Sequence, residues 1–459
     1  MLYFKTLQSN PLISYITTKP TSITNPINLS QKEIQIFDLF KEIIKEKNLK
    51  NIELRVAGGW VRDHILNIPS NDLDITIKGL DPKIFAKILN EKVNKDKYKI
   101  LSNYTLKGRN GFIINLTKTE IFDTDIDFIE LKENAFNDAI RRDFTFNSLF
   151  YNILENKIEV LLKLGIDDLK NGFIRSCATT VQKIDFDSFN IMRMLRFATK
   201  YQFIIDDKYL SDIINNKKIF QNDLLKNVSK EIIHKEINLI FSGPNPSFAI
   251  YSLYKLDLLK YVLHIGTNFK NIHNNNNFFT EKDILNCVNI FIVGNKIFEK
   301  YKSYFDGENY DDKYKISFYS ILLTIYMKNF TNESANMLAK IVLGNVLKLE
   351  DKCILKIINQ FDDFNKFFVK NEYNKLNVGL LLRKLLVKNL SKMIFISVAY
   401  EYVIKINSDK VLDKLDNVEL EKIFQKYYEF YKYMKKENLD NVNEIKPIID
   451  AKKNKKRIS

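Results

Sequence analysis

The chain has 459 residues, a formal net charge of +15 at pH 7 and 45% hydrophobic residues. This hydrophobic content predicts folded domains rather than a disordered chain, and the length is that of about two to four domains. No apolar run reaches the roughly 18 residues of a membrane-spanning helix, so we expect a soluble protein with no membrane partner. The excess of Lys and Arg favours a polyanionic partner such as nucleic acid; an AT-rich genome would also enrich lysine.

The two ends of the chain and its cysteines give indications of the cellular compartment. Residues 1–31 contain Ser and Thr but no Asp or Glu, which fits a mitochondrial transit peptide and a flexible leader equally well. The basic end at 451–459 fits a nuclear address or a frayed terminus. Three widely spaced cysteines and four scattered histidines form no disulfide framework or metal cluster. We therefore expect a reducing compartment, cytoplasmic or mitochondrial, with the nucleus still open. We favour a monomer.

Strands and helices alternate in the first part of the chain. Ser30 and Glu33 form a capping box ahead of an amphipathic helix. A strand follows over residues 51–57 and ends at a double glycine, and residues 71–77 alternate as a second strand. Further strands are expected within 112–131. The run FTFNSLFYNIL, residues 144–154, is helix-like in spacing.

Beyond about residue 183 the apolar spacing is nearly all helical. The change in pattern near 165–185 predicts a domain boundary, and the Asn-rich loop at 273–278 predicts a second one. Lysines recur throughout this part and suit phosphate contacts or a solvated helix face. We expect KYYEFYKYMKK, residues 426–436, to supply helix core and solvated lysines rather than a base-stacking surface.

Two aspartates in the first part suggest a metal site. Asp72 and Asp74, at positions i and i+2 of a predicted strand, face the same side. Their charges repel unless a cation lies between them, and Mg²⁺ prefers one or two carboxylates plus substrate phosphates. Asp127 is the candidate for a third carboxylate, with Asp125 on the same face. Alone, such a pair also fits a solvated strand end.

The double glycine lies shortly before these aspartates. Gly58 and Gly59 permit a positive φ and a close approach of the backbone to a ligand. A turn with free N–H groups at the start of a helix binds anions, and Arg62 is placed to add a charge-assisted bond to a phosphate. A lone Gly-Gly is more often a tight turn. Together with the paired aspartates, it indicates phosphoryl transfer.

Five motifs in a fixed order carry a family resemblance. They are GGWVRD…DLDITI (58–77), RRDFTFNSLFYN (141–152), GIDDLKNGFIRS (165–176), RMLRFATKYQFIID (193–206) and NVSKEIIHKEINLIFSGPNP (227–246). The set resembles the tRNA nucleotidyltransferases, or CCA-adding enzymes, of class II of the DNA polymerase beta-like superfamily, which also includes bacterial poly(A) polymerases. The resemblance covers about residues 50–265.

The resemblance implies an α+β fold, with a small mixed α/β nucleotidyltransferase head followed by an extended all-helical neck, body and tail. The implied parts are a leader (1–31), the head (32–182), the neck that binds nucleotide and RNA (183–270), and a body and tail that bind tRNA (271–459). The implied reaction adds CMP, CMP and AMP to the 3′ end of tRNA from CTP and ATP, without a nucleic-acid template, and releases pyrophosphate. Two Mg²⁺ ions held by Asp72 and Asp74 are the implied cofactors.

The resemblance also implies nucleotide contacts for residues of several motifs. They are Gly58, Gly59 and Arg62 for phosphates, Arg142, Asp143 and Asn147 for sugar and phosphates, and Arg193 and Arg196 near the base or phosphates. A salt-bridged helix face is the other interpretation of the last two arginines.

The residues expected to select the base depart from the family pattern, which is an acid followed by Asp, two residues and Arg. Here Phe186 replaces the acid, Asp187 is in place, and Asn190 replaces the arginine. A neutral amide in place of a charged donor weakens discrimination by about 1–3 kcal/mol. Ile232 stands where the last motif commonly has Arg. The departures leave three activities open: full CCA addition with relaxed selectivity, partial CC or A addition or poly(A) synthesis, and tRNA binding with little turnover.

Overall fold

The computed structural model describes residues 27–70, 72–93, 98–107, 113–121, 124–177, 187–262, 281–305, 309–328, 390–407 and 414–437, with short pieces between 361 and 439. Within these residues the chain forms two compact units. The head unit contains 27–177 and 201–215, and the helical unit contains 187–200 and the described residues from 216 onward. Most of the predicted leader, Phe186 and the predicted boundary at 273–278 lie outside the described residues.

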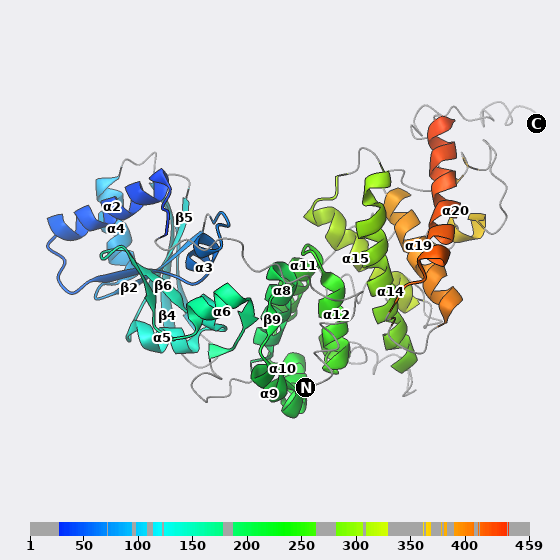
Figure 1. Cartoon of the computed structure of the whole chain (residues 1–459). Helices are drawn as coiled ribbons and strands as arrows, with labels where there is room; N and C mark the ends of the chain where they lie inside the picture. Colours follow the sequence, from blue (N-terminus) through cyan, green and yellow to red (C-terminus); the bar gives the residue numbers. More distant parts are fainter. Residues whose placement is uncertain are drawn as a thin grey trace, which may run out of the picture. The chain divides into compact units, whose positions relative to one another are not determined.

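The head unit is built on a seven-stranded sheet in the order β3-β4-β5-β2-β1-β6-β7. Figure 1 labels β2, β4, β5 and β6 of this sheet. Its strands are β1 (Glu53–Ala57), β2 (Asp72–Lys78), β3 (Tyr98–Lys107), β4 (Ile113–Ile121), β5 (Thr124–Glu130), β6 (Leu149–Asn152) and β7 (Lys157–Val160). The pairing of β2 with β5 is parallel, whereas the other neighbouring strands are antiparallel. Strands within 51–57, 71–77 and 112–131 are therefore confirmed.

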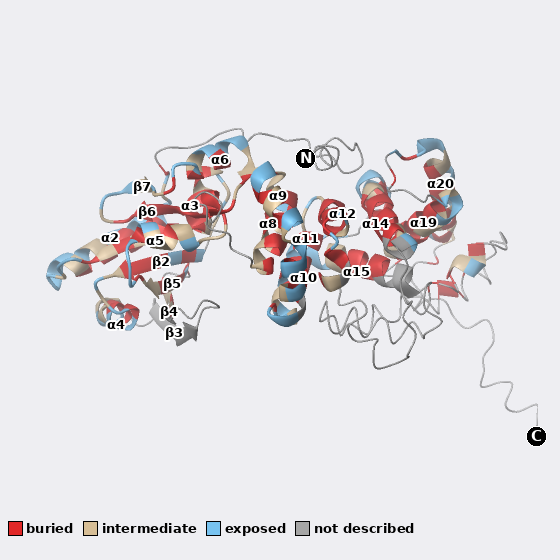
Figure 2. Cartoon of the chain, turned by 90° about the horizontal axis from the view of Figure 1, so that it is seen from below, coloured by how far each residue is buried: buried red, intermediate tan, exposed pale blue. Residues whose placement is uncertain are grey.

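One face of this sheet forms the core of the head with helices α2 (Gln31–Glu46) and α4 (Pro82–Lys92). The ring of Phe40 in α2 lies 5.6 Å from that of Phe85 in α4 and 5.7 Å from that of Phe128 in β5. Figure 2 shows buried residues along the central strands of the head. Since side chains alternate along a strand, the positions between the core residues all face the opposite side.

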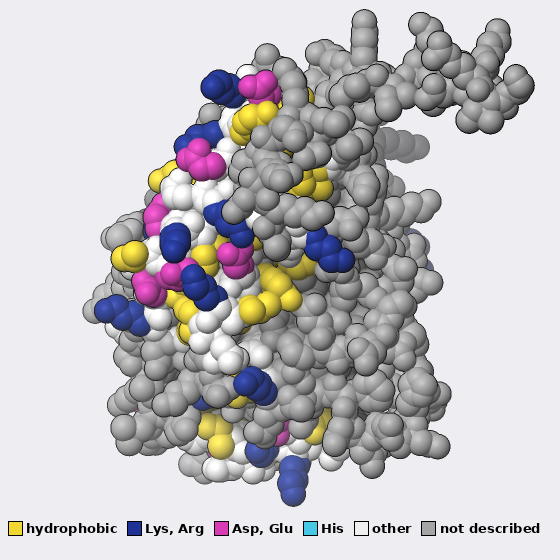
Figure 3. Space-filling model, turned by 90° about the vertical axis from the view of Figure 1, so that its right-hand side faces the viewer, with side chains coloured by type: hydrophobic (Ala, Val, Ile, Leu, Met, Phe, Trp, Pro, Cys, Tyr) yellow, Lys and Arg dark blue, Asp and Glu magenta, His cyan; other side chains and the backbone are white. Residues whose placement is uncertain are grey.

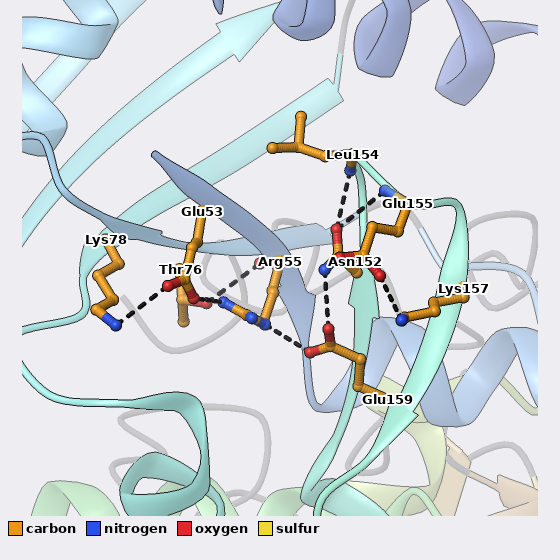
Figure 4. A network of polar contacts seen from close by, with 9 residues as sticks. All are labelled: Glu53, Arg55, Thr76, Lys78, Asn152, Leu154, Glu155, Lys157 and Glu159. Atoms are coloured by element: carbon orange, nitrogen blue, oxygen red, sulfur yellow. Dashed lines mark hydrogen bonds and ion pairs between the residues drawn. The ribbon is translucent and has the colours of Figure 1, made fainter. Parts of the chain in front are cut away.

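That opposite side carries a polar network centred on Arg55 (Figure 4). The Arg55 guanidinium donates to Glu159 of β7 at 2.6 Å and also to Glu53. Asn152 of β6 donates to Glu159 at 2.8 Å, and Lys78 of β2 donates to Glu53 at 3.1 Å. Because the network joins four strands, it supports their register on the face that also carries Asp72 and Asp74.

The helix-like interpretation of residues 144–154 is wrong. This run forms a 3₁₀ turn, η2 (Thr145–Asn147), and then strand β6 between β1 and β7. All four residues of β6 are buried. A short run that is buried on all sides cannot be told from a helix by its spacing, and here the pairing on both edges decides for a strand.

The GIDDLKNGFIRS motif ties the second stretch of the head unit to the first. It forms α6 (Gly165–Asn171) and β8 (Phe173–Ile174), and β8 pairs with β9 (Ile204–Ile205) ahead of α9 (Asp207–Asn215). The Asp168 carboxylate accepts from Thr145 Oγ1 at 2.6 Å and from Arg175 Nη1 at 2.9 Å. Arg175 also donates to Asp206 at 3.1 Å, so these ion pairs hold residues 201–215 in the head unit.

The helical unit contains no strand within its described residues. Its helices are α8 (Ser188–Tyr201, whose last residue belongs to the head unit), α10 (Lys217–Lys226), α11 (Lys230–Phe241), α12 (Pro246–Lys255), α13 (Leu259–Val262), α14 (Glu281–Tyr301), α15 (Asp312–Lys328), α19 (Leu390–Ile406) and α20 (Asn417–Lys436). None of the helices within the described ranges is long and apolar enough to cross a membrane.

Aromatic rings fill the core of this unit. Phe298 of α14 packs on Phe318 of α15 at 5.5 Å and on Phe395 of α19 at 5.8 Å. In α20, Tyr427 and Phe430 are buried while its last lysines are exposed, as expected for helix core and solvated lysines in residues 426–436. The described side chains on the face shown in Figure 3 mix Lys and Arg with Asp and Glu, so the positive charge there is dispersed.

A buried carboxylate connects α2 to α3 (Gly59–Ile65) in the head unit. Glu33 accepts from the backbone N–H of Ser30 at 2.7 Å, as the capping box predicts, and from Trp60 Nε1 at 2.8 Å. His64 Nε2 lies 2.9 Å from the same carboxylate. Burial opposes the charge, but the hydrogen bonds from His64 and Ser30 outweigh it and lower the pKa of Glu33 to about 2.

Replacing Glu33 with Gln is expected to destabilise the head unit by about 3 kcal/mol at pH 7. A carboxyl whose pKa is lowered on folding stabilises fully above its usual value of 4.5, and this contribution fades as the pH falls towards about 2. The difference between wild type and Glu33→Gln should therefore be smaller at pH 3.5 than at pH 7. Urea unfolding followed by the fluorescence of Trp60, the single tryptophan, measures it. Equal differences at both pH values would contradict the assignment.

Candidate functional site

Two carboxylates on β2 lie beside two more on β5. Both Asp72 and Asp74 are exposed on the face opposite the α2 and α4 core. In the parallel pairing, Asp72 is the register partner of Asp125, and Asp74 is the partner of Asp127. The same-face placement predicted for Asp72 and Asp74 thus holds, and the strand pairing brings the second pair alongside.

The electrostatics of this cluster favour a cation. Although Asp74 is open to solvent, surrounding protein atoms and the charge of Asp127 raise its pKa, with Asp72 adding to the effect and Arg142 opposing it. Lys118 of β4 donates to Asp127 at 2.8 Å, so the proposed third ligand is engaged by a lysine. Relief of this crowding by a bound cation would favour the charged form of Asp74.

The donor set suits a metal that takes only part of its coordination from protein. Within the part of the chain that the structure describes, no three His, Cys, Asp or Glu side chains are grouped to hold an ion. Mg²⁺ is commonly held by one or two carboxylates and completes its shell with waters and substrate phosphates. The exposed pair of Asp72 and Asp74 fits that chemistry.

The double glycine forms the predicted turn at the start of α3. Gly58 has a φ of +69° and precedes the first helical residue, Gly59, and no side chain caps the helix. A Cβ atom on Gly58 would lie 2.7 Å from Nη1 of Arg142. Two features therefore disfavour any residue other than glycine at position 58: the positive φ of the backbone and the Arg142 guanidinium packed against it.

Arg62 is buried beneath this turn and bonded to protein groups. Its Nε and Nη2 donate to Asp63 at 2.8 and 2.9 Å, and its Nη1 donates to Asn147 Oδ1 at 2.7 Å. Asn147 Nδ2 in turn donates to Asp143 at 3.0 Å. Three residues expected to contact nucleotide thus form one network, which leaves the phosphate role of Arg62 as a prediction.

Arg142 links the glycine turn to α5 (Ala135–Arg141). Its guanidinium donates to Asp138 of that helix at 2.9 Å and to the Asn147 carbonyl at 3.4 Å, and it lies over the Phe150 ring at 4.9 Å. It also opposes the rise in the pKa of Asp74. Arg142 thus lies beside the turn and also acts on Asp74.

The residues expected near the base lie on α8. The Asp187 carboxylate accepts from the N–H of Phe189 at 2.9 Å and so caps the helix, with Asn190 in its first turn. Arg193 lies 5.5 Å from the ring of Phe189. Arg196 donates to the buried Glu236 of α11 at 2.6 Å, which is the salt-bridged arrangement considered for it. These residues belong to the helical unit, and the glycine and aspartate residues belong to the head unit.

Sequence reasoning missed two members of the Arg62 network. Asp63 is the counterion of Arg62, and Tyr201 donates its hydroxyl hydrogen to Asp63 Oδ1 at 3.0 Å. The Arg-Asp sequence within GGWVRD was a signal for the first. No local pattern points to the second, because 138 residues separate Tyr201 from Asp63.

Replacing Gly58 with Ala is expected to destabilise the head unit by about 1–3 kcal/mol, because the positive φ is strained and the methyl group meets Arg142. Gly59→Ala is the matched control, since its Cβ would lie 3.6 Å from the nearest atom, Arg62 Nη2, in a helical residue. Thermal unfolding monitored by Trp60 fluorescence compares the two. Equal stability of both variants would contradict the interpretation of the turn.

Comparison with known proteins finds a domain match and similar sequences. Residues 54–175 match the poly A polymerase head domain. The chain is 31% identical over 264 residues to tRNA nucleotidyltransferase cca2 of Schizosaccharomyces pombe, covering 51% of this chain and 54% of that one. It is 25% identical over 483 residues to the mitochondrial CCA tRNA nucleotidyltransferase of Saccharomyces cerevisiae, covering 93% and 86%. The match thus spans about half the length of the first relative and most of the second.

A solved structure shares the fold. The Thermotoga maritima CCA-adding enzyme complexed with tRNA_CCA aligns with a TM-score of 0.54 and 18% identity, over 86% of this chain and 87% of that one. The expected fold, a mixed α/β head followed by helices, is confirmed. Residues 54–175 thus match a poly A polymerase head domain, and the chain is similar in sequence to proteins named as tRNA nucleotidyltransferases.

Proposed function

We propose that the chain is a Mg²⁺-dependent tRNA nucleotidyltransferase that adds CMP, CMP and AMP to the 3′ end of tRNA from CTP and ATP. The observation that carries the proposal is the pair Asp72 and Asp74 in the same unit as a positive-φ glycine turn backed by Arg142. Paired carboxylates and an anion-binding turn are the parts that phosphoryl transfer requires. The names of the matched relatives supply the substrate class.

The chemistry is a displacement at the α-phosphorus of the incoming nucleotide. The 3′-oxygen of tRNA forms the new bond as the bond to pyrophosphate breaks, and negative charge grows on the leaving group. Asp72 and Asp74 would hold two Mg²⁺ ions, which would lower the pKa of the attacking hydroxyl and neutralise phosphate charge.

The remaining head residues would bind the nucleotide. Gly58 leaves room for a phosphate beside the free N–H groups that open α3. Arg142 and the buried Arg62 would add positive potential there, and such fixed charges stabilise the leaving pyrophosphate without reorganisation. Asp143 and Asn147 would contact the ribose.

Residues at the first turn of α8 would select the base of the incoming nucleotide. Asp187 can accept a hydrogen bond from the amino group of cytosine or adenine, and Asn190 can donate to the adjacent ring nitrogen. Because Asn190 is shorter than arginine and uncharged, we expect weaker rejection of U and G than in a relative with Arg there. The departures at Phe186 and Asn190 favour partial CC or A addition as the second candidate.

The partner would be tRNA, held by lysines of the helical unit through its phosphates, and affinity would fall steeply with salt. The relative from Saccharomyces cerevisiae is named as mitochondrial. We therefore propose a mitochondrial location, with the cytoplasm as the alternative.

The deciding experiment incubates the purified protein with tRNA lacking CCA, CTP, ATP and Mg²⁺, and sequences the products. We expect CCA ends from the wild type, and a loss of more than 100-fold in Asp72→Ala with tRNA binding nearly unchanged, because only the metal-binding carboxylate is removed. Asp125→Ala removes the register partner of Asp72 and is the matched control, expected to stay within tenfold of wild type.

Each other outcome has a clear meaning. Products ending at CC, or extension only from CC, would select a partial enzyme. Long A tails would select a poly(A) polymerase. No extension under any nucleotide mixture would reject transfer and leave a tRNA-binding protein. Activity of Asp72→Ala within tenfold of wild type would reject the metal assignment.

Asn190→Arg is expected to raise the preference for C and A over U and G by about 5- to 100-fold, the effect of regaining a charged hydrogen bond. Competition between the four nucleoside triphosphates in the extension assay measures it. Asn222→Arg adds the same charge at an exposed position of α10 and serves as the control. An unchanged preference in Asn190→Arg would mean that the base is selected elsewhere.

A further inference from the structure

Tyr201 contacts both members of the Arg62–Asp63 pair. Its hydroxyl donates to Asp63 Oδ1 at 3.0 Å, and its ring lies under the Arg62 guanidinium, with 5.2 Å between Cζ and the ring centroid. Tyr201 is the last residue of α8 and the first residue of the second stretch that belongs to the head unit. The Tyr201 side chain therefore holds the Arg62–Asp63 ion pair from the position at which the chain re-enters the head unit.

The Arg62–Asp63 pair needs such an anchor. Adjacent residues on a helix do not face each other, yet Asp63 receives two hydrogen bonds from the side chain of its neighbour. The same oxygen, Oδ1, accepts from Arg62 Nε at 2.8 Å and from Tyr201. The tyrosine hydroxyl thus limits where the carboxylate can lie, and the carboxylate sets the plane of the guanidinium.

The position of this guanidinium bears on the glycine turn. Arg62 is 7% exposed, so its charge is weakly screened. Its Nη2 lies 3.6 Å from the site of a Cβ on Gly59, the first residue of α3. The Arg62 charge and the N–H groups of that helix end therefore lie beside the same turn, where each favours negative charge. A small displacement of Arg62 would weaken the field where a phosphate is expected.

We propose that Tyr201 is a positioning residue for the nucleotide triphosphate, acting through Asp63 to hold Arg62 against the glycine turn. The inference rests on the proposed function, because it assumes that this turn receives the phosphates.

Tyr201→Phe tests the inference, because it removes the hydroxyl and keeps the ring beneath Arg62. We expect CTP and ATP to bind about 3- to 10-fold more weakly, by the same factor, since the triphosphate is common to both. Binding of CMP should change less than twofold. Equilibrium titration of the full chain in Mg²⁺ measures all three.

Tyr427→Phe is the matched control. The Tyr427 hydroxyl donates to Glu401 at 2.7 Å, so the variant loses the same kind of bond in the helical unit and leaves the head unit unchanged. Its affinity for CTP should equal that of the wild type even where its thermal stability falls. Equal losses of CTP affinity in both variants would reduce the role of Tyr201 to general stability and overturn the inference.

A double variant tests the route through Arg62. Tyr201→Phe added to Arg62→Lys should cost no further CTP affinity, because lysine lacks the fork that Asp63 orients. Fully additive losses would overturn the inference, as would wild-type CTP affinity in Tyr201→Phe. Failure of the wild type to extend tRNA while it binds CTP would reject the proposed function alone, because the binding comparison does not require transfer.

Discussion

The candidate site depends on the parallel pairing of β2 with β5 in an otherwise antiparallel head sheet. This register places Asp72 beside Asp125 and Asp74 beside Asp127, and all four face away from the core. A slip of one residue would turn the Asp72 and Asp74 side chains towards Phe40 and Phe85 and lose the core as well. Core packing therefore enforces the position of the carboxylates, and their mutual repulsion creates the demand for a cation.

A second constraint is the set of charges held inside the head unit. Arg62 with Asp63, and Arg175 with Asp168, are ion pairs with little exposure to water. Such pairs add little net stability, because desolvation offsets their attraction, but breaking one leaves an unpaired charge. Their value lies in geometry: Arg62 fixes the underside of the glycine turn, and Arg175 holds residues 201–215, including Tyr201, in the same unit.

The local features of the head were predictable because each rests on neighbouring residues. The capping box of Ser30 and Glu33, the positive φ of Gly58 and the shared face of Asp72 and Asp74 all follow from short patterns. The structure of residues 144–154 was not predictable, because a run that is buried on all sides shows no periodicity that distinguishes a strand from a helix. Strand pairing on both sides made part of that run β6.

The sequence by itself determined the motif order, the glycine turn and the paired aspartates, since these depend on residue type and spacing over a few positions. Only the tertiary structure decided that Arg62 bonds to Asn147, 85 residues away, and Arg196 to Glu236, 40 residues away. It also decided that Tyr201 anchors Asp63. The partner of a buried charge depends on which helices and strands pack against each other. That packing depends on residues throughout the core, and the residues next to the charge in the sequence do not specify it.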